Sequence, residues 1–266
     1  MATPTILTDV DRRGVATVTF NRPHVNNAYN GDLIQELLRA LSELGSRSDL
    51  RVVVLRGNGK HFQAGADLTW LRDVAGRSAD ENVRISGATA EATHRLNMLP
   101  VPTVALIQGA CFGGGTGFAA VCDVVIAADD AIFSISETRW GLMAGIIIPQ
   151  LCDAMGVRQV RRYALTGERF DAHEARRIGL VHTVVPRAEL AAAGERIVDQ
   201  LLQNAPDANA QTKAATLEHA RGALTEETLA RLVAQHAAKR RSAEAVEGLA
   251  SFSEKRSARW YPGAGA

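Results

Sequence analysis

The sequence contains few aromatic residues, few cysteines and almost no net charge. Phe, Trp and Tyr make up 5% of its 266 residues, and 30 Lys and Arg balance 29 Asp and Glu to a net charge of +1. A chain without excess charge has no field that would attract nucleic acid or an anionic membrane. Its 46% of hydrophobic residues is typical of a globular protein with a large core. We therefore expect neither nucleic acid nor a membrane as partner.

The three cysteines, Cys111, Cys122 and Cys152, lie in apolar segments without metal-ligand spacing. They are predicted to be buried thiols in a reducing compartment, and no metal site is expected. Residues 1–9 lack the basic and apolar regions of a secretion signal, so a cytoplasmic location is expected. The most apolar stretch, residues 101–128, is interrupted by polar residues and glycines, which disfavours a membrane span.

Strand and helix patterns divide the chain into two regions. Short runs rich in β-branched residues predict strands that are covered on both faces; they are Val15–Phe20, Val52–Arg56, Thr103–Gln108 and Asp123–Ala127. Apolar residues at helical spacing predict a helix over Asp32–Leu44. Beyond about residue 188 the composition becomes helical, with breaks at Pro206 and Gly222. The prediction is an α/β core over residues 1–186 and a helical region over residues 187–266.

Two glycine-containing segments follow predicted strands. The first is Gly57–Leu68, and the second is Gly113–Gly117, which opens an apolar helix. Neither has the spacing of a Walker loop or of a dinucleotide-binding fingerprint. Both offer unencumbered backbone amides, which can stabilise an oxygen that gains negative charge. Taken alone, each such segment is more often a tight turn or a close packing site.

Together with their flanks, these segments form a series of motifs: Asn21-Arg22-Pro23, Asn27-Ala28, Gly57–Leu68, Gln108–Gly115, Cys122-Asp123, Ser136–Leu142, Tyr163–Glu168 and Glu247–Arg256. In order and spacing, this series resembles the enoyl-CoA hydratase/isomerase (crotonase) superfamily. The resemblance implies a spiral of β-β-α turns followed by a helical C-terminal region that forms trimers, commonly paired into hexamers. It also implies an acyl-CoA thioester as substrate, with no cofactor beyond the coenzyme A of that substrate.

The resemblance also assigns candidate site residues. The backbone amides of Ala66 and Gly114 would hold the thioester oxygen, and Glu137 would move protons. Positions that match the family's CoA-binding residues are Asn27, Ala28, Ala64, Ala66, Asp67 and Leu68, and in the C-terminal region Phe252 and Lys255. Candidates for the wall of the acyl pocket are Trp70, Leu71, Val74, Trp140, Leu142 and Met143.

One expected carboxylate is missing. Hydratases of the family usually present two glutamates to water, but the first position here is Gly117 and only the second, Glu137, is acidic. One carboxylate can accept a proton from water and deliver one to carbon, so hydration of a 2-enoyl-CoA is the leading hypothesis. Residues 132–185 resemble bacterial methylglutaconyl-CoA hydratases, which favours a branched substrate. A 3-enoyl to 2-enoyl isomerase and a non-catalytic acyl-CoA-binding protein are the alternatives.

Overall fold

The computed structural model describes residues 3–220, 222 and 225–263 and contains a six-stranded sheet. Its strands, in spatial order, are β1 (Ile6–Val10), β2 (Val15–Phe20), β3 (Val52–Gly57), β4 (Thr103–Ile107), β6 (Val124–Ala128) and β9 (Thr183–Val185). Strands β1 and β2 are antiparallel, and all other neighbours in this sheet are parallel. The four strands expected from the sequence are confirmed, with ends that differ by at most one residue.

A second, three-stranded sheet contains β5 (Ala110–Phe112), β7 (Ile132–Ser134) and β8 (Phe170–Asp171). The chain passes from β4 to β5 and then from β6 to β7, so it crosses repeatedly between the two sheets. An isolated bridge between Gln63 and Cys111 adds the turn after β3 to the same arrangement. The α/β spiral implied by the family resemblance is therefore confirmed.

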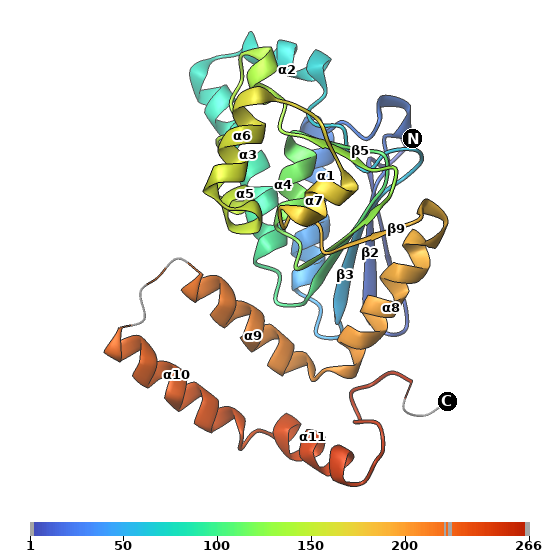
Figure 1. The fold of residues 1–266 in the computed structure, drawn as a ribbon, viewed down its shortest axis with the longest axis vertical. Helices are drawn as coiled ribbons and strands as arrows, with labels where there is room; N and C mark the ends of the chain where they lie inside the picture. The colour runs from blue at the N-terminus through green and yellow to red at the C-terminus, as the bar shows by residue number, and fades with distance from the viewer. Residues whose placement is uncertain (1–2, 221, 223–224, 264–266) are drawn as a thin grey trace.

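Helices cover both faces of the large sheet, because adjacent residues of its parallel strands point to opposite sides. On one face lie α1 (Gly31–Gly45), α3 (Ala79–Asn97), α4 (Gly114–Ala120), α5 (Ile148–Met155), α6 (Val157–Thr166) and α7 (Ala172–Arg177). Their buried apolar side chains belong to one cluster, which also includes Val53 and Leu55 of β3. On the other face, α8 (Leu190–Gln203) packs against Val52 and Val54 (Figure 1).

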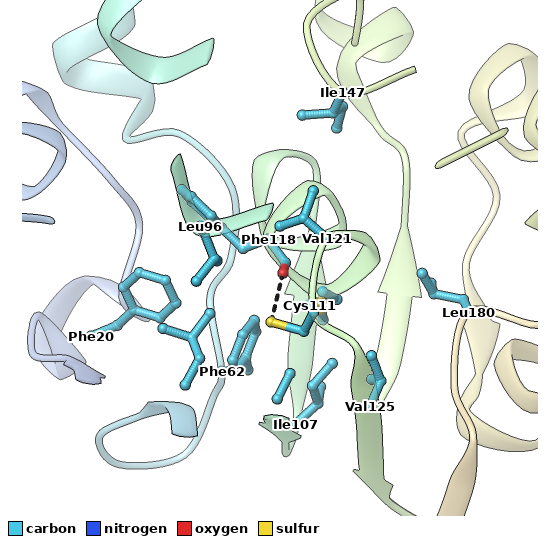
Figure 2. Packing of buried hydrophobic residues seen from close by; sticks show 14 of the residues in the cluster. Phe20, Phe62, Leu96, Ile107, Cys111, Phe118, Val121, Val125, Ile147 and Leu180 are labelled. Atoms are coloured by element: carbon cyan, nitrogen blue, oxygen red, sulfur yellow. Dashed lines mark hydrogen bonds between the residues drawn. The ribbon is translucent and has the colours of Figure 1, made fainter. Parts of the chain in front are cut away.

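Aromatic rings fix the position of α4. The rings of Phe20 and Phe62 meet edge to face at 5.5 Å, and the ring of Phe118 lies 5.4 Å from that of Phe20. All three side chains are almost completely buried (Figure 2). Because Phe118 belongs to α4, this cluster fixes that helix, and its N-terminal residue Gly114, against the core.

The C-terminal region is helical and extends from the core (Figure 1). It contains α9 (Pro206–His219), α10 (Glu226–Lys239) and α11 (Ala243–Ser253). The helices break at Pro206 and around Gly222, as predicted, and also between α10 and α11, which was not predicted. Several apolar side chains of the last two helices are exposed: Leu229, Val233, Val246, Leu249 and Phe252. A helical C-terminal region is thus confirmed, whereas its role in trimerisation stays a prediction. Within the described residues, no helix combines the length and apolarity needed to cross a bilayer.

Candidate active site

A cavity of about 810 Å³ lies between the glycine-containing segments and helices α2 (Leu68–Ala75) and α3. Residues from the segments that follow β3, β5 and β7 line it, including Ala66, Gly114 and Glu137. The six residues expected at the wall of the acyl pocket also line it: Trp70, Leu71, Val74, Trp140, Leu142 and Met143. The cavity therefore gathers the candidate chemical groups and the candidate acyl-pocket residues in one place.

The loop after β3 presents the amide of Ala66. The Gln63 side chain is fully buried and forms two hydrogen bonds with the backbone of Gly65. It donates to the Gly65 carbonyl at 2.8 Å and accepts from the Gly65 N–H at 2.9 Å. Gly65 has φ +89°, a conformation in which side chains are strained, so glycine suits this turn. The N–H of Ala66 donates to no group in the described part of the chain. It is left free for a ligand.

The amide of Gly114 is presented by the start of α4. Gly113 has φ +50°, and its N–H donates to the carbonyl of Ser134 at the end of β7, at 2.8 Å. Gly114 is the first residue of α4, so its N–H has no acceptor within the helix. It donates to no other described residue. Together with the Ala66 amide, it provides a second free donor at the cavity.

Glu137 begins the short 3-10 helix η2 (Glu137–Trp140), just beyond β7. Its carboxylate lies against the Cα of Gly113, because a Cβ added there would be 3.0 Å from Oε1. The other oxygen, Oε2, is buried without a hydrogen-bond partner in the described residues. Burial raises the pKa of Glu137 above its ordinary value, against a smaller opposing effect of a backbone hydrogen bond. A carboxylate in such a position is well placed to exchange protons.

These groups form a recognisable chemical arrangement. Two free amides can stabilise an oxygen that becomes negatively charged, as the oxygen of a thioester does when it is converted to an enolate. Glu137 is the acidic side chain among the described residues that line the cavity. The arrangement can therefore support proton transfer next to a polarised carbonyl group.

Comparison with known proteins identifies the family. The sequence model of the family described as enoyl-CoA hydratase/isomerase matches residues 11–262. The chain belongs to the enoyl-CoA hydratase/isomerase family. As a member of this family it is an enzyme with the crotonase fold, as the resemblance of its motifs implied.

Relatives named as a hydratase and as an isomerase have similar sequence identity to this chain. A short-chain-enoyl-CoA hydratase of Clostridium acetobutylicum is 33% identical over 72% of this chain and 73% of its own length. A mitochondrial Delta(3,5)-Delta(2,4)-dienoyl-CoA isomerase of Dictyostelium discoideum is 32% identical over 92% of this chain and 87% of its own. The crystal structure of an enoyl-CoA hydratase from Shewanella pealeana has a TM-score of 0.92 at 35% identity, covering 96% of both chains.

Ile147 occupies the space beside Gly117, the position at which hydratases of the family usually carry their first glutamate. A Cβ added to Gly117 would lie 2.4 Å from the Cγ2 of Ile147. Such a distance is well inside the usual contact of about 3.5–4.0 Å between carbon atoms. The missing carboxylate is thus replaced by an apolar side chain that is itself buried and lines the cavity.

Some residues expected to bind CoA lie at the cavity, and others support the loops around it. Ala64 and Leu68 line the cavity, but Asn27, Ala28 and Asp67 do not. The fully buried Asn27 amide group donates to the carbonyls of Asn58, His61 and Phe62. That hydrogen bonding ties the segment containing Asn27 to the loop after β3.

Asp67 caps α2, accepting hydrogen bonds from Thr69 N–H and Trp70 N–H, and forms an ion pair with Arg22 at 3.1 Å. Burial by itself would raise the pKa of Asp67, but these hydrogen bonds outweigh burial and lower it. The carboxylate is therefore charged at neutral pH and contributes to the start of α2.

Phe252 and Lys255 lie far from the cavity within this chain. Phe252 is 85% exposed on α11, and neither residue lines the cavity. Figure 1 places α11 and α2 at opposite ends of the molecule. The structure of one chain therefore does not bring these two residues together with the other candidates.

The residues lining the cavity that sequence reasoning did not propose include Tyr29, Ile147, Arg139 and Arg169. The two arginines form no ion pair with any described residue, and the guanidinium of Arg169 lies 5.3 Å from the ring centre of Phe112. Arg139 could have been proposed from the sequence as a site residue, because it lies only two residues from the candidate Glu137. Tyr29 directly follows the Asn27-Ala28 motif and could have been considered with it.

Proposed function

We propose that this protein adds water to a 2-enoyl-CoA, with syn stereochemistry, to give a 3-hydroxyacyl-CoA. The observation that carries the proposal is that two free backbone amides, of Ala66 and Gly114, and the carboxylate of Glu137 line one cavity. The amides suit the oxygen of an enolate, and the carboxylate suits proton transfer on one side of it.

In the proposed reaction, Glu137 removes a proton from water while the water oxygen forms a bond to the β-carbon. The π electrons of the carbon–carbon double bond move towards the thioester, whose oxygen becomes negative and is held by the two amides. Glu137 then gives a proton to the α-carbon as the enolate collapses. The sum is one H and one OH added to the double bond, and Glu137 ends in its starting state.

A second reaction uses the same groups. Moving a proton between the α- and γ-carbons of a 3-enoyl-CoA needs one acid and no water. The close packing of Ile147 on Gly117, which leaves no room for a second carboxylate, favours this alternative.

Mass measurement in ¹⁸O-labelled water separates the possibilities. With a panel of 2-enoyl-CoA and 3-enoyl-CoA esters, hydration yields 3-hydroxyacyl-CoA with solvent oxygen, and isomerisation alone yields 2-enoyl-CoA without it. Tight binding of esters with no turnover on any of them would instead favour a non-catalytic acyl-CoA-binding protein. Labelled 3-hydroxyacyl product is the expected result.

We further propose a branched, methylglutaconyl-like acyl group. An acyl group of this kind carries a free carboxylate, and Arg139 and Arg169 supply cations at the cavity without an ion-pair partner among the described residues. A planar guanidinium suits a carboxylate because it can donate two parallel hydrogen bonds. This substrate would therefore find a complementary charge that crotonyl-CoA, which has no carboxylate, does not use.

The selectivity between two substrates tests this assignment. The ratio of kcat/KM for 3-methylglutaconyl-CoA over crotonyl-CoA should fall by about 10- to 100-fold in Arg139→Met, the scale of a hydrogen bond between charged groups. Arg177→Met is the matched control, because Arg177 pairs with Glu174 and does not line the cavity. A wild-type preference for crotonyl-CoA, or an unchanged ratio in Arg139→Met, would contradict the assignment.

The C-terminal helices are proposed to form the trimer contact. Exposed apolar side chains on α10 and α11 would be covered there, and Phe252 and Lys255 could reach the cavity of a neighbouring copy. Sedimentation at several protein concentrations tests this proposal, and a monomer at all of them would contradict it.

We also propose that the protein is a soluble cytoplasmic enzyme that needs no cofactor beyond the coenzyme A of its substrate.

A further inference from the structure

Tyr29 is bound to the loop that presents the Ala66 amide. Its N–H donates to the carbonyl of Gly65 at 2.9 Å, and its own carbonyl accepts from Asp67 N–H at 2.8 Å. These two bonds form a parallel bridge between Tyr29 and Ala66. The position of Tyr29 is therefore coupled to one of the two free amides of the site.

The ring of Tyr29 reaches across to the other free amide. A Cβ added to Gly114 would lie 2.6 Å from Cε1 of the ring and 3.4 Å from the hydroxyl oxygen. On another side the ring packs against Trp70, with ring centres 5.8 Å apart. The absence of a side chain at Gly114 thus provides the space in which the ring of Tyr29 lies.

The hydroxyl of Tyr29 and the carboxylate of Glu137 lie against consecutive residues of one loop. Tyr29 contacts Gly114, whereas Glu137 contacts Gly113. The two side chains do not hydrogen-bond to each other, and the Tyr29 hydroxyl bonds to no other described residue. Both groups line the cavity, so a small molecule could lie between them.

The electrostatics agree with this placement. Burial, followed by the negative charge of Glu137, raises the pKa of Tyr29 to about 12. The phenol is therefore neutral at physiological pH, with one hydrogen to donate and an oxygen that can accept. A neutral donor that lines the same cavity as a carboxylate is suited to orient a water molecule whose proton the carboxylate takes.

We propose that the Tyr29 hydroxyl holds the water molecule that Glu137 deprotonates, in place of the carboxylate that is absent at Gly117. This inference rests on the proposed hydratase function. The phenol donates a hydrogen bond to the water oxygen, or accepts one from its second hydrogen, and stays protonated throughout. Glu137 takes the water proton, and the oxygen adds to the β-carbon, so the atoms balance as in the reaction above. Tyr29 thereby contributes by orienting the nucleophile.

The test compares two reactions of Tyr29→Phe, which removes the hydroxyl and keeps the ring. Hydration of the best 2-enoyl-CoA needs the water, whereas exchange of the α-hydrogens of butyryl-CoA with D₂O needs only Glu137 and the two amides. We expect kcat for hydration to fall on the order of 10- to 100-fold, because the water molecule would no longer be held in its reactive position. The exchange rate and the affinity for the ester should be retained. Tyr163→Phe is the matched control, because that buried hydroxyl bonds to Glu174 and does not line the cavity.

Each contrary outcome has its own meaning. An equal fall in hydration and exchange would overturn the proposal, because the hydroxyl would then act on the enolate oxygen or on the fold. Unchanged hydration in Tyr29→Phe would overturn it too, leaving the ring as packing. If wild-type protein hydrates no 2-enoyl-CoA, the proposed function fails before any variant is compared, and no added water remains for Tyr29 to hold.

Discussion

Gly117 and Ile147 are packed so closely that replacing the first should strain the second. In Gly117→Ala the new Cβ would meet the Cγ2 of Ile147 at 2.4 Å and its Cβ at 2.9 Å. Both atoms are close to the backbone of Ile147. The χ1 torsion of this β-branched residue is restricted, so rotation of the side chain cannot remove the clash. The backbone of α4 or of the segment before α5 must move instead.

The magnitude follows from two opposing effects. Replacing glycine by alanine inside a helix is worth about 0.5–1 kcal/mol in favour of folding. Overpacking a well-filled core costs about 1–3 kcal/mol. Gly87, in the middle of α3, separates the two effects because no atom lies within 4 Å of the Cβ that Gly87→Ala would add. The difference in unfolding free energy between the two alanine variants should therefore be about 1–3 kcal/mol, with Gly117→Ala the less stable.

A double-mutant cycle assigns the difference to the contact with Ile147. Ile147→Ala alone should cost about 2–5 kcal/mol, since it empties buried space. The methyl group of Ala at position 117 would refill part of that space, so the double variant should be more stable than the sum of the single changes predicts, by about 1–2 kcal/mol.

Melting temperatures at one protein concentration measure these changes, at about 2–4 °C per kcal/mol for a chain of this size. Equal shifts for Gly117→Ala and Gly87→Ala, or strict additivity in the cycle, would refute the packing argument.

Glu137 and Asn27 are expected to affect activity and stability in different ways. Glu137→Gln should lower turnover by at least ~100-fold with ester affinity retained, and unchanged turnover would remove Glu137 from the mechanism. Because burial raises the pKa of Glu137, the native state binds this proton more tightly than the unfolded chain, and stability is lost as pH rises through the raised pKa. Glu137→Gln should therefore melt higher than wild type at neutral pH, with the difference vanishing at about pH 4 or below. A lower melting temperature at neutral pH would contradict the burial of Oε2 without a hydrogen-bond partner. Asn27→Ala should cost about 2–3 kcal/mol because it leaves buried carbonyls unpaired. Asn58→Ala, which truncates an exposed side chain, should cost less than about 0.5 kcal/mol, and equal losses would contradict the role given to Asn27.

The central strands and the first helix could be predicted from the sequence because they follow from local pattern. Val52–Leu55 is continuously apolar and buried, as expected for a strand packed on both faces, and α1 repeats apolar residues at helical spacing. The spiral came only from the family resemblance. Strands as short as β5, β7 and β8 carry too little pattern to reveal that they pair with one another.

The amides of the candidate site were predictable by motif, but their surroundings were not. Gly117 was noted as a missing glutamate, yet nothing in the sequence connects it with Ile147, 30 residues further along the chain. The ring of Tyr29 similarly meets Gly114 only because two turns of the spiral lie side by side. Contacts between turns depend on the register of the whole fold, which local pattern does not encode.

The arrangement of the site follows from the order of the spiral's turns. Ala66 follows β3, Gly114 follows β5 and Glu137 follows β7. Hydrogen bonds between turns hold them in place: Phe112 N–H donates to Gln63 and Gly113 N–H donates to Ser134. Since the amides belong to these linked backbones, side-chain substitution can change the proton-transfer groups and the acyl wall while leaving the oxygen-binding pair intact. A packed Ile147 in place of a second carboxylate is a change of this kind: in the proposed reaction it would alter how water is held and leave the donors for the thioester oxygen unchanged.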